Sequence, residues 1–195
     1  AWFGFTSARN GGWPNCGGDR TWLAPEIELF IGDLARPGQT YRGPPQLDPG
    51  NWQVDDAAEG LALTNTAVLE LHRAGRAVGV ALRKTLNPAA NPLRDTPLAS
   101  QLEYAGYGQQ VTLEVFPEPA GPPLGLGVWN LLQLPQPGRM LVATFYQATP
   151  CRVFGPVRAA ELKLSPHLVR WSMGGTVDRK IAIAAEPLAG RAGYL

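Results

Sequence analysis

The sequence predicts an all-β protein, an antiparallel β-sandwich that forms a single domain over residues 1–195. Two observations lead to this prediction. Short segments in which apolar and polar residues alternate recur along the chain, as they do in half-buried strands. Between them lie turns rich in glycine and proline, of which the sequence has 23 and 19, and these residues interrupt helices. Short strands punctuated in this way are typical of sandwiches and barrels of ordinary single-domain length.

The clearest alternation covers residues 76–86. One face of this strand is predicted to lie in the core and carries Val78, Val80, Leu82 and Leu86. The other face carries Ala77, Gly79, Ala81, Arg83 and Thr85. The small residues beside Arg83 fit two interpretations: a sheet surface that binds a ligand, or close packing of another sheet with Arg83 in a salt bridge.

Other strands are expected on both sides of this segment. They are residues 27–31, 52–56, 60–65, 100–107, 110–116, 127–134, 139–147, 151–157, 161–164, 168–173 and 179–185. Residues 61–74 also fit a helical period in part, but the surrounding pattern favours strand. The prolines and glycines of residues 33–51 predict a long loop without regular structure, and ordered loops of this length are usually functional.

Charge and composition exclude several classes of function. With 17 Lys and Arg against 16 Asp and Glu the net charge is +1, so neither nucleic acid nor an anionic membrane is expected as a partner. No apolar run approaches a membrane span, and a soluble protein is predicted, of undetermined compartment and oligomeric state. Because His72 and His167 are the only histidines, no metal site is expected, and no cofactor is predicted. Cys16 and Cys151 are expected to be free thiols, with a disulfide between them as the alternative.

Residues 17–26 gather charged and aromatic side chains between turn residues, and the segment is expected to be exposed. Within it, Arg20 and Glu26 have two interpretations. They contact adjacent hydroxyls of a sugar, or they pair with each other or with loop carbonyls and clamp the loop of residues 33–51. Asp19 and Glu26 are the weak catalytic candidates among the carboxylates.

Six short motifs together resemble the galactose mutarotase-like (aldose 1-epimerase-like) superfamily, most closely its uncharacterised bacterial branches. They are residues 17–26 (GGDRTWLAPE), 44–48 (PPQLD), 80–86 with Arg83, 126–135 (LGVWNLLQLP), 153–155 (VFG) and 180–183 (KIAI). The resemblance implies a β-supersandwich whose concave sheet binds a sugar or oligosaccharide. Both ends of this chain are shorter than the family pattern, so the chain is expected to be a trimmed homologue or a fragment. Asp19 occupies the position where some relatives carry histidine.

Active members of that superfamily interconvert the anomers of an aldose with a base and an acid, so the resemblance implies a carbohydrate-binding protein with aldose 1-epimerase-like activity. The alternative is a non-catalytic carbohydrate-binding or structural β-sandwich. Sugars are recognised by aromatic faces and planar polar groups. The expected sugar-binding residues are Arg20, Trp22, Glu26, Arg83, Trp129 and Gln133. For the two tryptophans, packing in the core is the other interpretation. Arg83 and Gln133 are expected to lie on the same concave sheet surface.

Overall fold

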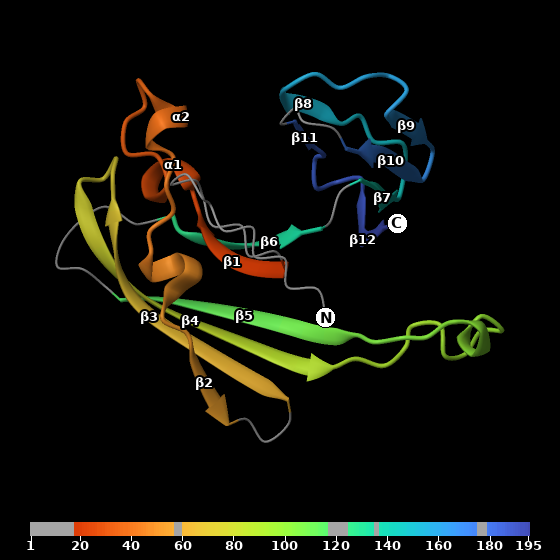
Figure 1. Cartoon of the computed structure of the whole chain (residues 1–195), viewed down its shortest axis with the longest axis horizontal. Helices are drawn as coiled ribbons and strands as arrows, with labels where there is room; N and C mark the ends of the chain where they lie inside the picture. The colour runs from red at the N-terminus through yellow and green to blue at the C-terminus, as the bar shows by residue number, and fades with distance from the viewer. Residues whose placement is uncertain (1–17, 57–59, 117–124, 135–136, 175–178) are drawn as a thin grey trace. The chain divides into compact units, whose positions relative to one another are not determined.

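The computed structural model describes residues 18–56, 60–116, 125–134, 137–174 and 179–195 (Figure 1). Strands make up 53% of these residues, in several antiparallel sheets, so the predicted all-β class is confirmed. Among the described residues no helix is long and apolar enough to cross a membrane. The chain divides into two compact units, Ala1–Leu132 and Gln133–Leu195. The expectation of one domain stays a prediction.

A four-stranded antiparallel sheet dominates the first unit (Figure 1). Its strands, in spatial order, are β2 (Gln53–Asp56), β3 (Leu61–Leu71), β4 (Arg76–Pro88) and β5 (Tyr107–Phe116). These strands confirm four of the predicted segments, and β3 settles the choice between helix and strand. The turn between β3 and β4 ends at Gly75, whose φ of 62° lies in the left-handed region that favours glycine.

The core of this unit lies against one face of the sheet. Val78, Val80 and Leu82 of β4 are at most 1% exposed, which confirms the predicted core face of that strand. Leu86 is only half-buried, because β4 runs past the edge of the core. The other buried members of the cluster come from β1, α1, η1 and β3 and are Trp22, Leu23, Leu29, Phe30, Leu47, Leu69 and Leu71.

Strand β1 (Gly18–Ala24) pairs with β6 (Gly127–Gln133) in a separate two-stranded sheet. Four consecutive residues of β1, numbers 20–23, are buried. The expectation that residues 17–26 are exposed is therefore wrong for the centre of the segment. Alternate side chains of a strand point to opposite faces, so this burial requires packing on both sides of β1.

Two predicted strands of the first unit are wrong. Residues 27–31 begin instead with a short helix, α1 (Glu26–Leu29), which ends with a 2.7 Å bond from the Phe30 amide to the Glu26 carbonyl. Helical geometry lets the adjacent Leu29 and Phe30 both reach the core from one side of the segment, whereas adjacent residues of a strand point to opposite faces. In residues 100–107, a 3₁₀ turn, η2 (Ala99–Gln101), is followed by irregular backbone up to the start of β5.

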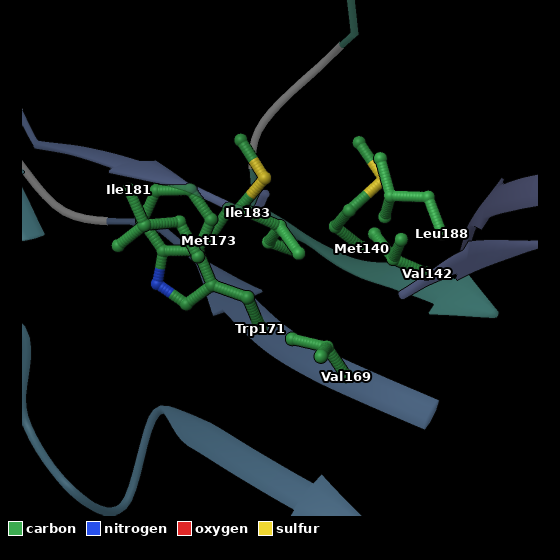
Figure 2. A pocket seen from close by; sticks show the side chains of 8 residues that line it. All are labelled: Met140, Val142, Val169, Trp171, Met173, Ile181, Ile183 and Leu188. Atoms are coloured by element: carbon green, nitrogen blue, oxygen red, sulfur yellow. The ribbon is translucent and has the colours of Figure 1, made fainter. Parts of the chain in front are cut away.

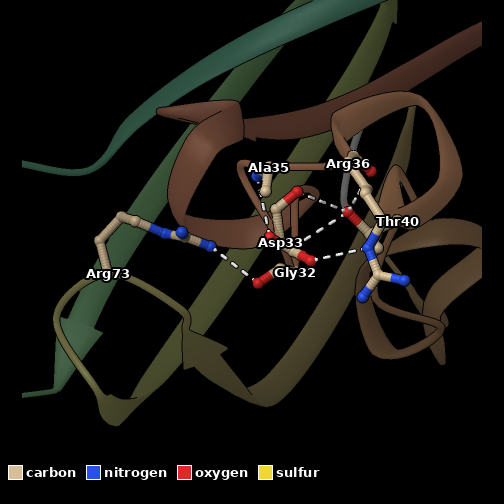
Figure 3. Close-up of polar contacts among 6 residues, drawn as sticks. All are labelled: Gly32, Asp33, Ala35, Arg36, Thr40 and Arg73. Carbon is tan, nitrogen blue, oxygen red and sulfur yellow. Dashed lines mark hydrogen bonds and ion pairs between the residues drawn. The ribbon is translucent and has the colours of Figure 1, made fainter.

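The loop of residues 33–51 contains two short helical turns, α2 (Pro37–Thr40) and η1 (Gln46–Gly50), so the expectation that it lacks regular structure is wrong in those turns. Its first part is closed by polar contacts (Figure 3). The Asp33 carboxylate accepts bonds from the Ala35 amide at 2.8 Å and from Arg36 Nε at 3.0 Å. The Thr40 hydroxyl accepts a hydrogen bond from the Asp33 amide at 3.0 Å. Arg73, from the β3–β4 turn, donates to the Gly32 carbonyl at 3.0 Å.

The second unit has a four-stranded sheet of order β12-β7-β10-β9 and a two-stranded sheet of β11 and β8. The strands are β7 (Gly138–Thr144), β8 (Cys151–Phe154), β9 (Leu162–Ser165), β10 (Leu168–Met173), β11 (Lys180–Ala182) and β12 (Leu188–Tyr194). All but β12 were expected. In β12 the pairing register shifts between Leu188 and Ala192, and small residues hide the alternation. Cys151 is exposed with a free thiol, and Cys16 lies outside the described residues.

An apolar cavity of about 340 Å³ lies within this second unit (Figure 2). Its lining comes from four of the strands and the segments that flank them. The residues are Met140, Val142, Val169, Trp171, Met173, Ile181, Ile183 and Leu188. Apart from the Trp171 ring nitrogen, their side chains carry no nitrogen or oxygen that could orient a polar ligand.

Candidate functional site

A polar pocket of about 320 Å³ lies in the first unit beside β1, and we call it the β1 pocket. It is lined by Asp19, Arg20, Thr21, Leu47, Asp48, Pro49, Trp52, Leu63 and Lys84. These residues come from β1, from the turn η1 and the residues after it, and from two strands of the large sheet. Four of them are charged, two positive and two negative, around one aromatic ring.

Asp48 holds the first pair of charges together. One of its carboxylate oxygens accepts a bond from Arg20 Nη1 at 3.2 Å and another from Trp22 Nε1 at 2.8 Å. The Arg20 and Asp48 side chains are 8% and 14% exposed, so this ion pair is largely shielded from water. Arg20 therefore ties the loop of residues 33–51 to β1. This contact agrees with the clamp interpretation, with the Asp48 carboxylate of the loop as a partner of Arg20.

Lys84 forms the second pair. Its ammonium lies 3.4 Å from Asp19 Oδ1 and 5.7 Å from the centre of the Trp52 ring, and the whole residue is 7% exposed. Within the described part of the chain the bond to Asp19 is its only hydrogen bond. An ammonium has three donors, so Lys84 has two left for water or a ligand. This is an unusual state for a charge so deeply buried.

The sequence contains a sign that Lys84 is unusual, although the strand prediction did not make use of it. Lys84 lies between Leu82 and Leu86 on the face of β4 that also carries the buried Val78 and Val80. A charge at such a position is buried against its preference, and it therefore requires a partner. The sequence does not show which residues supply that partner, because Asp19 is 65 residues away along the chain.

Glu26 lies outside the lining of the β1 pocket. Its carboxylate accepts a bond from the Tyr41 hydroxyl at 3.2 Å, so Glu26 also holds the loop of residues 33–51, at a different point from Arg20. Burial of the phenol, together with the charge of the Glu26 carboxylate and this hydrogen bond, raises the pKa of Tyr41 well above its ordinary value.

The two tryptophans expected to face a sugar pack in the core. Trp22 is 5% exposed, and its ring lies 4.7 Å from that of Phe30 and 5.4 Å from that of Trp129, in an edge-to-face arrangement with the latter. Trp129 is partly buried against the same cluster. Neither lines the β1 pocket, where the aromatic ring is Trp52. Trp22 and Trp129 therefore lie where the second interpretation, packing in the core, expects them.

Arg83 is on the opposite face of β4 from Lys84. It forms a salt bridge with Asp55 of β2 at 3.3 Å, and both side chains are substantially exposed. The small residues on this face of β4 do not all leave open space. The Phe116 ring of β5 packs over Gly79, where a Cβ would lie 2.9 Å from it. The side chain of Gln133 lies outside the described residues, so a surface shared by Arg83 and Gln133 stays a prediction.

No group of three or more metal-ligating side chains occurs in the described ranges. His72 and His167 are both exposed. Comparison of the chain with family models, with curated proteins and with solved structures gives no match. The chemistry of the first unit therefore rests on its own residues. They form a small pocket with balanced charges, one aromatic ring and an ammonium with two open donors.

Proposed function

We propose that this chain is a carbohydrate-binding protein whose sugar occupies the β1 pocket, and that its sheets form a β-sandwich of the galactose mutarotase-like type. The observation that supports the proposal best is the state of Lys84. Its ammonium is buried beside an indole ring and makes one hydrogen bond of 3.4 Å. Sugar hydroxyls would accept from the two remaining donors and offset the desolvation of the charge.

The other groups of the pocket suit the same ligand. Trp52 offers an aromatic surface for the C–H groups of a pyranose, and Asp19 accepts hydrogen bonds from hydroxyls. The cavity volume of about 320 Å³ is near the lower end for ligand pockets and suits a single sugar ring. Because the lining charges cancel and the chain carries a net charge of +1, we do not propose nucleic acid as a partner.

Titration with neutral monosaccharides tests the proposal, with D-galactose and D-glucose as probes and tryptophan fluorescence and calorimetry as readouts. Replacing Lys84 by Met removes the charge and keeps the apolar stem, and we expect affinity to fall about tenfold or more. The control is Arg94→Gln, which removes an exposed charge that lies outside the lining of the β1 pocket. Absence of binding at about 100 mM of either sugar, or equal affinity in Lys84→Met, contradicts the proposal.

The Asp19–Lys84 pair favours a second candidate, aldose 1-epimerase-like activity. A carboxylate and an ammonium 3.4 Å apart are a base and an acid within reach of the two oxygens bonded to the anomeric carbon. Asp19 would take the proton of the anomeric hydroxyl while Lys84 protonates the ring oxygen, so that the ring opens and closes again on either face. NMR measurement of the exchange between galactose anomers tests this activity. Binding without faster exchange leaves a binding module, and acceleration that survives Asp19→Asn excludes Asp19 as the base.

A further inference from the structure

A second cleft of the first unit, with a volume of about 500 Å³, is separate from the β1 pocket, and we call it the β3 cleft. It lies between the loop of residues 33–51 and the face of β3 that points away from the core. Its lining residues fall into two chemical groups. The polar side chains are Gln39, Thr40, Arg42, Gln46, Glu70 and His72, and the main apolar ones are Leu29, Pro44, Pro45 and Val68.

Most of the polar side chains of this cleft form no hydrogen bond or ion pair within the described ranges. Thr40 bonds within its own loop. For the other five, the hydrogen bonds found in the described ranges involve only the backbone: the amides of Gln39, Arg42 and His72, and the carbonyl of Gln46. In the β1 pocket, by contrast, each charged side chain already has a partner of opposite charge.

Arg42 and Glu70 are the informative members of this set. They carry opposite charges and line the same cleft, yet neither forms an ion pair with the other or with another described residue. A guanidinium binds a carboxylate through two parallel hydrogen bonds, and a carboxylate binds an ammonium. Two such groups in one cleft can both be satisfied by a single ligand that carries both charges.

We infer that the β3 cleft binds a free amino acid with an aliphatic side chain, the carboxylate on Arg42 and the ammonium on Glu70. Val68 is 64% exposed although it is apolar, and together with Pro44 and Pro45 it offers a wall for an aliphatic side chain. His72 supplies a further polar group for the carboxylate. No Trp, Tyr or Phe ring lines the cleft, so it lacks the surface on which sugars usually stack. This site is independent of the proposed sugar site.

The probe is L-leucine, titrated into the full-length protein and followed by amide NMR shifts and calorimetry. Two analogues each lack one charge: 4-methylpentanoate has no ammonium and 3-methylbutylamine has no carboxylate. We expect leucine to bind about tenfold more tightly than either analogue, and to shift the backbone amide signals of residues 39–43, 46 and 68–72. Arg42→Gln should remove the advantage of leucine over the amine, and Glu70→Gln its advantage over the acid.

Arg94→Gln is the matched control, because Arg94 is exposed, outside the cleft and paired only with Asp95 among side chains. All three variants should keep the melting temperature of the unmodified protein, since the side chains of Arg42 and Glu70 form no hydrogen bond or ion pair within the described ranges. Three results would overturn the inference: no shifts at about 10 mM leucine, equal binding of leucine and both analogues, or displacement of leucine from the cleft by D-galactose.

Discussion

Asp48 is expected to be the residue through which the loop of residues 33–51 stabilises the first unit. Its carboxylate accepts hydrogen bonds from both Arg20 and Trp22 of β1. Replacing it by alanine deletes both bonds and removes the Asp48 charge from beside the buried Arg20 guanidinium. We therefore expect Asp48→Ala to destabilise the protein strongly while leaving the hydrophobic core unchanged.

The size of the effect follows from burial. Breaking a buried ion pair by removing one partner costs about 3 to 5 kcal/mol, because the remaining charge is uncompensated. Asp48 is 14% exposed, so water reaches it in part, and Arg20 and Trp22 have other contacts. Both facts place the loss at the lower end, about 3 kcal/mol. For a chain of this length that corresponds to a fall in melting temperature of roughly 6 to 12 °C.

Urea denaturation followed by tryptophan fluorescence measures the loss, with the midpoint and the slope compared between variants. Asp95→Ala is the control, because Asp95 is 84% exposed and its contact with Arg94 is 3.5 Å. That variant should change the free energy of unfolding by no more than about 0.5 kcal/mol. A loss below about 1 kcal/mol for Asp48→Ala would refute the view that this ion pair clamps the loop. In a double variant with Arg20→Met the losses should not add, since both changes remove the same bond.

Two further predictions concern the same loop. Asn65 is 2% exposed; its side chain donates to the Gln46 carbonyl at 2.9 Å and accepts from the Asn51 amide at 3.3 Å. Asn65→Leu should therefore lower the free energy of unfolding by about 2 to 3 kcal/mol. Urea denaturation measures this loss, and an unchanged midpoint would contradict the prediction. The raised pKa of Tyr41 means that the stability it contributes is complete below the ordinary tyrosine pKa of about 10 and is lost as pH rises above that value. Tyr41→Phe should therefore flatten the decline of the urea midpoint above about pH 10, and an equally steep decline in this variant would show that Tyr41 is not the cause.

Local pattern was sufficient to predict most of the strands. In residues 77–82 of β4 small and large apolar residues alternate, because one face meets the core and the other does not, and both the strand and its buried face follow from period two alone. The same rule failed at residues 27–31, where a short apolar run also fits one turn of helix. It missed β12, where glycine and alanine carry too little hydrophobic contrast to mark a face.

The candidate site was predicted only in part. Within residues 17–26, Asp19 and Arg20 line the β1 pocket, but residues 20–23 are buried in a strand, against the expectation that the segment is exposed. Trp52 and Lys84 were not predicted as members, because each lies on a segment whose pattern indicates only a strand.

What the sequence alone determined is the secondary-structure class and which β4 residues face the core, since both depend on neighbours a few residues apart. Only the tertiary structure decided the partners of the charges. Asp48 lies 28 residues from Arg20, and Asp19 lies 65 residues from Lys84. The physical reason is that an ion pair depends on distance in space, and a chain that returns through a 19-residue loop and several strands can bring many different carboxylates to the same cation.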